Sequence, residues 1–161
     1  MSAIVQNLKE KNASYASSFD KGHLALPPAK QYLVLTCMDA RIDPASAFGI
    51  DLGDAHVIRN AGASARDALR SIVISEQLLG TKEILLVKHT GCGMLTFKNE
   101  DASDAVNELK SLDIDFLPFP QLETAVEEDV KFLKGTSLIP DDVPISGWVY
   151  EVETGKVRSV V

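Results

Sequence analysis

The sequence has few of the residues that would tie it to a disulfide scaffold, a membrane or a nucleic acid. Only two of its 161 residues are cysteines, which excludes the disulfide framework of small secreted domains. No apolar run approaches the roughly 20 residues that a membrane-spanning helix needs. Lysine and arginine number 16 against 23 acidic residues, and the resulting net charge of −7 argues against nucleic-acid binding.

What remains has the composition of an ordinary globular protein, with 45% hydrophobic and 24% charged residues. No internal repeat, low-complexity tract or linker divides it, so we expect one domain over residues 1–161. Residues 1–20 are polar, of mixed charge and unlike a secretory or transit peptide, which predicts a cytoplasmic protein. This segment is weakly amphipathic, with a loosely helical spacing of its apolar residues, and we expect a helical arm that needs a partner surface.

Three short apolar runs, at residues 31–36, 55–59 and 83–88, have the continuous pattern of strands buried on both faces. A helix is predicted between the second and third runs, where Ser64 and Asp67 form a start resembling a capping box and Gly80 ends the pattern. Strand, helix and strand in this order indicate a right-handed parallel crossover.

The second half of the chain predicts two more helices and a hairpin. The helices cover residues 101–112 and 122–133, and the hairpin joins 143–151 to 156–161 through a turn at 153–155. The predicted fold class is therefore α/β, with a small, mostly parallel β-sheet flanked by helices and a C-terminal antiparallel hairpin.

Cys37 follows the first predicted strand and His89 follows the third, so both lie at the carboxyl edge of a parallel sheet. Cys92 comes one glycine-flanked turn later, and its sulfur can return to the same point. Two thiolates and one imidazole are the ligands of a tetrahedral zinc site with one open position. Metal binding is favoured over two unrelated buried thiols, because ligand type, number and location agree.

Asp39 and Arg41 lie close to the first cysteine in the sequence. At a surface they would form a loop ion pair of little energetic weight. Beside a metal they have two arrangements: Asp39 either fills the fourth coordination position or pairs with Arg41 and leaves that position to water. By contrast, His56 lies within a strand-like run and is predicted to be structural.

The segment Asn60-Ala61-Gly62 follows the second predicted strand. Spacing alone favours a turn, and a turn of this kind can also present backbone N–H groups to an oxyanion.

These motifs resemble those of the β-class carbonic anhydrases. Segments 37–41, 59–62 and 89–92 stand in the family's order and at familiar separations. The short chain is similar to the compact branch of the family, whose scaffold and zinc site also serve carbonyl sulfide hydrolase and carbon disulfide hydrolase. Gly91 departs from that branch, in which a polar residue often occupies this position.

The resemblance implies a role for each of the motif residues. A Zn²⁺ ion would be bound by Cys37, His89 and Cys92. A catalytic dyad would be formed by Asp39 and Arg41.

The resemblance also implies a substrate pocket and an assembly. The pocket would be lined by Asn60, Gly62 and Ala63. A homodimer or homotetramer is expected, with the active site near the subunit interface and the N-terminal helix packed on a partner subunit.

The function expected from this resemblance is the reversible hydration of CO2 to bicarbonate by a zinc-activated hydroxide. Two alternatives stay open. The same scaffold would also serve hydrolysis of carbonyl sulfide to CO2 and H2S, since that linear substrate differs by one sulfur. The cysteines could instead belong to a non-enzymatic zinc-binding or redox-sensing module, although such sites more often use closed sets of four ligands in short loops.

Overall fold

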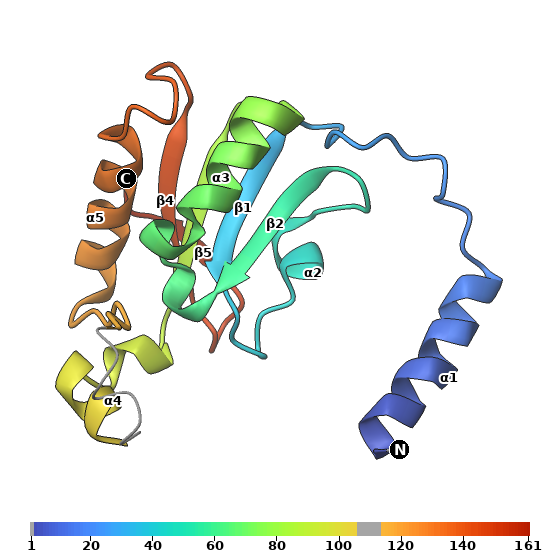
Figure 1. Ribbon diagram of the computed structural model, residues 1–161, viewed down its shortest axis with the longest axis horizontal. Helices are drawn as coiled ribbons and strands as arrows, with labels where there is room; N and C mark the ends of the chain where they lie inside the picture. Colours follow the sequence, from blue (N-terminus) through green and yellow to red (C-terminus); the bar gives the residue numbers. More distant parts are fainter. Residues whose placement is uncertain (1, 106–113) are drawn as a thin grey trace.

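The computed structural model describes residues 2–105 and 114–161, which form a five-stranded sheet in the order β2-β1-β3-β4-β5 (Figure 1). The strands are β1 (Tyr32–Cys37), β2 (Ala55–Asn60), β3 (Ile84–His89), β4 (Ile145–Tyr150) and β5 (Val157–Ser159). The first four lie parallel to one another, and β5 pairs antiparallel with β4. The predicted fold class is confirmed, with strand ends displaced by one residue or more.

The helices are α1 (Ala3–Ser17), α2 (Pro44–Phe48), α3 (Ala65–Leu79), α4 (Asn99–Ala105) and α5 (Leu122–Lys134), with short 3₁₀ turns η1 (Ala61–Ala63) and η2 (Gly93–Leu95). Helices α3 and α5 contact each other and pack on the same sheet. The helix predicted over 101–112 begins earlier, as α4, and its second half lies outside the described residues. Within the described residues, no helix is both long and apolar enough to span a bilayer.

Helix α3 begins and ends as its sequence predicts, with one change at the cap. Ser64 Oγ accepts the Asp67 N–H at 3.3 Å, and Gly80 closes the helix in the left-handed conformation. The reciprocal bond of the predicted capping box comes from Asn60, whose Oδ1 accepts the Ser64 N–H at 2.8 Å. The end of β2 and the start of α3 are therefore joined by a side chain four residues before the helix-capping serine.

The central strands β1 and β3 carry the core. Leu33, Leu35, Ile84 and Leu86 have no exposed surface, and each contributes about 2 kcal/mol of hydrophobic free energy by its burial. Strands β1 and β3 are covered on both faces, so their sequences are continuously apolar rather than alternating. The same burial was predicted for β2 and is wrong: β2 is an edge strand, and none of its residues is buried.

The parallel register brings three sequence-distant residues to one edge of the sheet. Cys37 of β1 lies opposite Asn60 of β2, and Thr36 lies opposite Val87 of β3, two residues before His89. Side chains at the carboxyl ends of β1, β2 and β3 therefore share one edge, which is where open α/β sheets bind ligands.

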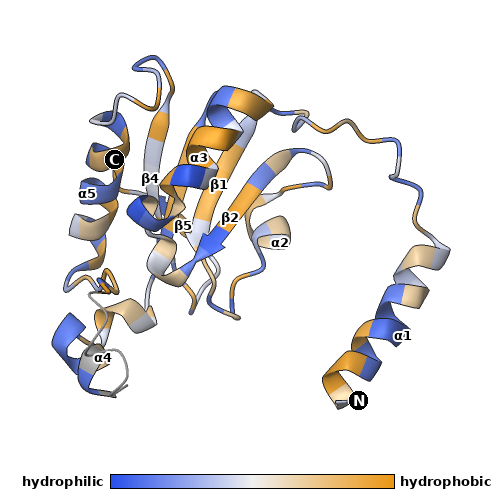
Figure 2. Ribbon diagram, viewed as in Figure 1, coloured by the Kyte–Doolittle hydropathy of each residue, from blue (hydrophilic) through white to orange (hydrophobic). Residues whose placement is uncertain are grey.

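Helix α1 stands apart from the rest of the described structure, joined to β1 by an extended segment (Figure 1). None of its residues is buried, and Ile4 and Leu8 are 81% and 65% exposed. Figure 2 shows apolar residues on this helix as well as on the distant sheet. The predicted arm is therefore helical, and within the part of the chain that the structure describes its apolar side chains stay unburied, although the Tyr15 ring lies 5.4 Å from that of Phe19.

A substitution where strand β4 packs closely against helix α5 tests this fold. A Cβ atom built on Gly147 of β4 would overlap Val126 of α5 and lie 3.0 Å from Val130. We expect Gly147→Ala to lower the free energy of unfolding by about 1–3 kcal/mol through overpacking, measured by urea denaturation. Gly93→Ala is the control, since no atom lies within 4 Å of its Cβ position. Equal stability of the two variants would contradict this packing.

Candidate metal centre

Three predicted ligands meet at the carboxyl edge of the sheet. Ligand atoms of Cys37, His89 and Cys92 all lie within 4.8 Å of one another, and all three residues are buried. The first two end the neighbouring strands β1 and β3. Cys92 reaches them because Gly91 turns the chain with a φ of +60°, a conformation that residues with a Cβ atom rarely adopt.

The imidazole of His89 is oriented for metal binding. Its Nδ1 lies 2.9 Å from the Thr90 carbonyl oxygen, and because a carbonyl only accepts, Nδ1 carries the hydrogen. In the neutral ring, Nε2 then holds a lone pair. This Nε2 atom is buried and has no hydrogen-bond partner among residues 2–105 and 114–161. A buried nitrogen without a partner, beside two sulfurs, fits a zinc ion with N and S ligands.

The two sulfurs interact strongly with each other. Hydrogen bonding from Cys92, followed by contacts with His89 and the backbone N–H groups of Asp39 and Gly62, lowers the pKa of Cys37 to about 4 against the effect of burial. The pKa of Cys92 is raised, first by its hydrogen bond to Cys37 and then by burial. Burial would lower the pKa of His89, but Cys37 outweighs it and the pKa is raised. In the metal-free cluster Cys37 is therefore the thiolate and Cys92 keeps its proton, which a divalent cation bound by both sulfurs would displace.

Asp39 and Arg41 form a bidentate ion pair beside this cluster. Arg41 Nε donates to Oδ1 of Asp39 at 2.9 Å, and Nη2 donates to Oδ2 at 2.7 Å. The guanidinium holds the pKa of Asp39 well below its usual range. Asp39 Oδ2 is 3.8 Å from His89 Nε2, so the carboxylate adjoins the cluster while it is paired with Arg41. Of the two arrangements predicted for Asp39, the structure contains the paired one.

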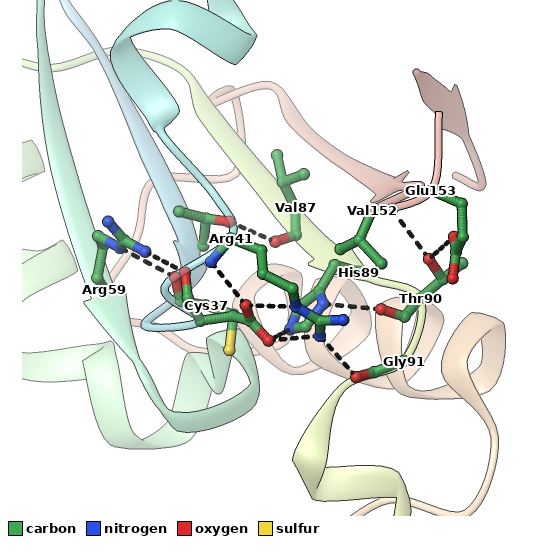
Figure 3. Close-up of polar contacts among 11 residues, drawn as sticks. Cys37, Arg41, Arg59, Val87, His89, Thr90, Gly91, Val152 and Glu153 are labelled. Carbon is green, nitrogen blue, oxygen red and sulfur yellow. Dashed lines mark hydrogen bonds and ion pairs between the residues drawn. The ribbon is translucent and has the colours of Figure 1, made fainter. Parts of the chain in front are cut away.

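Sequence reasoning gave Arg59 no role, yet it fixes the loop that carries the dyad. Its Nε donates to the Cys37 carbonyl at 3.0 Å and its Nη2 to the Asp39 carbonyl at 2.7 Å (Figure 3). Arg59 lies opposite Thr36 in the register of β1 and β2. Parallel pairing of these two strands was the one signal that could have placed it there.

A second unpredicted connection joins the end of β3 to the turn between β4 and β5. Thr90 Oγ1 donates to Glu153 at 2.8 Å and accepts the Val152 N–H at 3.1 Å. Arg41 Nη2 donates to the Gly91 carbonyl at 2.9 Å, so the dyad is attached to the same segment. Figure 3 shows these contacts converging from three parts of the chain.

The segment after β2 forms the predicted turn. The Asn60 amide donates to the Ser64 carbonyl and accepts the Ser64 N–H, so both of its polar atoms close the turn. Gly62 and Ala63 follow each other with φ values of +70° and +52°. Their contribution to a substrate pocket stays a prediction. His56 bonds to Ser75 Oγ at 2.7 Å, away from the cluster, as expected for a structural histidine.

Comparisons with known proteins agree with this geometry. The sequence profile of the family described as "Carbonic anhydrase" matches residues 32–115. The chain is 40% identical to "Beta-carbonic anhydrase 1" of Mycobacterium tuberculosis, over 98% of both chains. It is 36% identical to "Carbon disulfide hydrolase" of Acidianus, covering 83% of this chain and 78% of that protein. A solved carbonic anhydrase from Glaciozyma antarctica superposes with a TM-score of 0.94, at 45% identity and full coverage of both chains.

The ligand set is tested by metal analysis. Wild-type protein should bind close to one zinc per chain, and Cys92→Ser should lower the zinc content at least about tenfold, since an alcohol is a poor replacement for a thiolate ligand. His56→Gln, which changes the histidine bonded to Ser75, is the control and should keep its zinc. A full complement of zinc in Cys92→Ser would contradict the proposed set.

Proposed function

The chain belongs to the β-carbonic anhydrase family, and on this basis we propose that it is a zinc enzyme that hydrates CO2 reversibly to bicarbonate. The observation that carries the proposal is the meeting of Cys37, His89 and Cys92 beside an Asp39 carboxylate that is already paired with Arg41. This arrangement offers three metal ligands and leaves one coordination position free, as catalytic zinc sites do.

Zinc would be held by the two sulfurs and by Nε2 of His89, the buried atom without a partner. When bound, it supplies the Lewis acidity that lowers the pKa of a water molecule from about 15.7 to roughly 7. The protein keeps His89 in the required tautomer through the Thr90 carbonyl.

Asp39 acts as a hydrogen-bond acceptor in this proposal. The Asp39 carboxylate accepts three hydrogen bonds from Arg41, two from the guanidinium and one from the backbone N–H. Asp39 therefore remains ionised and fixed in orientation. An ionised carboxylate would accept a hydrogen bond from the attacking water or hydroxide. That bond would direct a lone pair of the attacking oxygen toward the carbon of the substrate.

A second candidate function is the hydrolysis of carbonyl sulfide or carbon disulfide. It is favoured by the 36% identity to a carbon disulfide hydrolase. The same ligands and dyad would serve, because these substrates are also small, linear and attacked at a central carbon. Preference among them would depend on the width and polarity of the space above the metal.

A paired assay tests the proposal. We expect wild-type protein to hydrate CO2, followed with a pH indicator, and to release little sulfide from carbonyl sulfide. Asp39→Ala should retain its zinc but lower kcat/KM for CO2 by about 100-fold or more, because the acceptor that orients the nucleophile is lost. Faster sulfide release than CO2 hydration would instead establish the second candidate.

The non-enzymatic alternative makes a different prediction in the same experiment. A zinc-stabilised module would show neither activity, and mild chelation would unfold it. Wild-type rates in Asp39→Ala would reject the assigned role of the dyad, whichever substrate is used.

We also propose that the chain functions as a homo-oligomer built on dimers. The sheet face that carries Tyr32, Val34, Leu85 and Val87 borders a cavity of about 430 Å³, which Trp148 also lines. Exposed apolar residues of α1 face no surface in the described part of one chain. A second copy would supply a surface for each, and burial of both in a dimer would be favourable.

Charge placed on the apolar side of α1 tests this assembly. Ile4, Leu8 and Tyr15 recur on one side of the helix, while Ala13 lies on the opposite side. We expect Leu8→Glu to raise the dimer dissociation constant by about 100-fold, since a charge would enter an apolar contact. Sedimentation velocity measures the change, and Ala13→Glu is the charge-matched control. Equal assembly of the two variants would show that α1 does not pack on a partner.

A further inference from the structure

Lys88 of β3, the residue before His89, has a buried, positively charged side chain. Only 2% of its side chain is exposed, and its strand neighbours alternate between the two faces of the sheet. His89 is directed to the metal cluster, whereas Lys88 is directed to the face covered by α5. Nothing in the proposed chemistry uses Lys88, although a buried charge without a purpose is costly.

The ammonium group of Lys88 has three acceptors within hydrogen-bond reach. Its Nζ lies 2.8 Å from the Gly62 carbonyl, 3.2 Å from the Ala63 carbonyl and 2.8 Å from Oδ2 of Asp129. A lysine ammonium has three hydrogens, so these contacts use all of them. Lys88 borders a cavity of about 270 Å³, but it has no donor left for a ligand there.

The two carbonyls belong to the most unusual backbone of the site. Gly62 and Ala63 both have positive φ values, and Ala63 carries a Cβ atom in a conformation that disfavours one. A strained pair of residues persists only when its surroundings hold it. Two charge-assisted hydrogen bonds from a buried ammonium provide such a restraint.

Fixing these carbonyls also fixes the N–H groups on the opposite edge of the segment. In a trans peptide the C=O and N–H bonds point in opposite directions, so the Ala63 N–H points away from the Lys88 ammonium. The Ala63 carbonyl shares its peptide group with the Ser64 N–H, which donates to Asn60 Oδ1 at 2.8 Å. One edge of the segment therefore faces Lys88, and the segment directly follows Asn60, which lies opposite Cys37 in the register of β1 and β2.

Neighbouring side chains hold Lys88 itself in place. Asp129 Oδ2 also accepts the Ala65 N–H at 3.2 Å, which joins α5 to the start of α3. The Phe119 ring lies 4.7 Å from Nζ and would be 2.9 Å from a Cβ atom on Gly62. Lys88, Asp129, Phe119 and Gly62 thus form one tightly packed cluster behind the metal site.

We propose that Lys88 is a positioning residue, which clamps the Gly62–Ala63 carbonyls so that the opposite edge of this segment forms a rigid wall of the reaction site. The inference deepens the proposed function and rests on it for its kinetic consequence. Its structural part, the restraint of residues 61–64, stands independently of any activity.

The test is Lys88→Met, which keeps the length and apolar stem of the side chain but removes the ammonium. We expect the zinc content to be unchanged, amide hydrogen exchange in residues 61–64 to be about tenfold faster, and kcat/KM for CO2 per bound zinc to fall about tenfold. Arg66→Met is the control, because Arg66 borders the same cavity but packs on Phe132 and should change neither quantity.

Other outcomes are also decisive. Wild-type exchange in residues 61–64, or faster exchange spread equally over α3 and α5, would overturn the proposal and leave Lys88 a residue of general stability. If wild-type protein lacks CO2 hydration but local exchange still rises in Lys88→Met, the proposed function fails and the clamp stands. If Lys88→Met does not fold, Lys88→Met/Asp129→Asn replaces it, since that variant leaves no unpaired buried charge and keeps the acceptor for Ala65.

Discussion

The burial of two sulfurs and one imidazole nitrogen at a single point is the constraint that governs the surrounding structure. Two sulfurs within 4.8 Å compete for protons, and the Nε2 atom of His89 has no partner in the described residues. Folding alone would not favour such a cluster, because burial of a thiolate and of an unpaired polar atom costs free energy. The surrounding hydrophobic sheet makes it tolerable, and a divalent ion would remove the conflict.

The sheet supplies the rigidity that the cluster needs. Buried leucine and isoleucine residues of β1 and β3 fix the two strands side by side, so the positions of Cys37 and His89 follow from the register. Loops then complete the site, and each is held by a basic side chain. Arg59 binds the Cys37–Asp39 backbone, and Lys88 binds the Gly62–Ala63 backbone. Arg41 joins its carboxylate partner to the Gly91 carbonyl. Basic residues in this acidic protein therefore organise backbone around the metal site as well as balancing charge.

Helix α1 is the part of the architecture that the described residues of a single chain leave without a packing surface. Its cap is formed by Ser2, yet none of its apolar residues is buried. The same chain also has a cavity over the apolar face of the sheet, a surface that apolar side chains could cover. Intrinsic helix formation and a solvent-exposed apolar stripe are both local properties of residues 3–17, whereas a surface for that stripe must come from elsewhere.

The sequence by itself determined the elements with strong local signals. Continuous apolar runs predicted β1, β2 and β3, and Ser64 and Gly80 correctly predicted the ends of α3, because hydrophobic periodicity and capping are properties of short segments. It also predicted that Cys37, His89 and Cys92 would meet, since parallel strands end at one edge. Only the tertiary structure decided that Asp39 is paired with Arg41, that Asn60 supplies half of the α3 cap, and that Arg59 and Lys88 hold the loops. Those choices depend on which side chain reaches which backbone group across space, and no spacing along the chain encodes that distance.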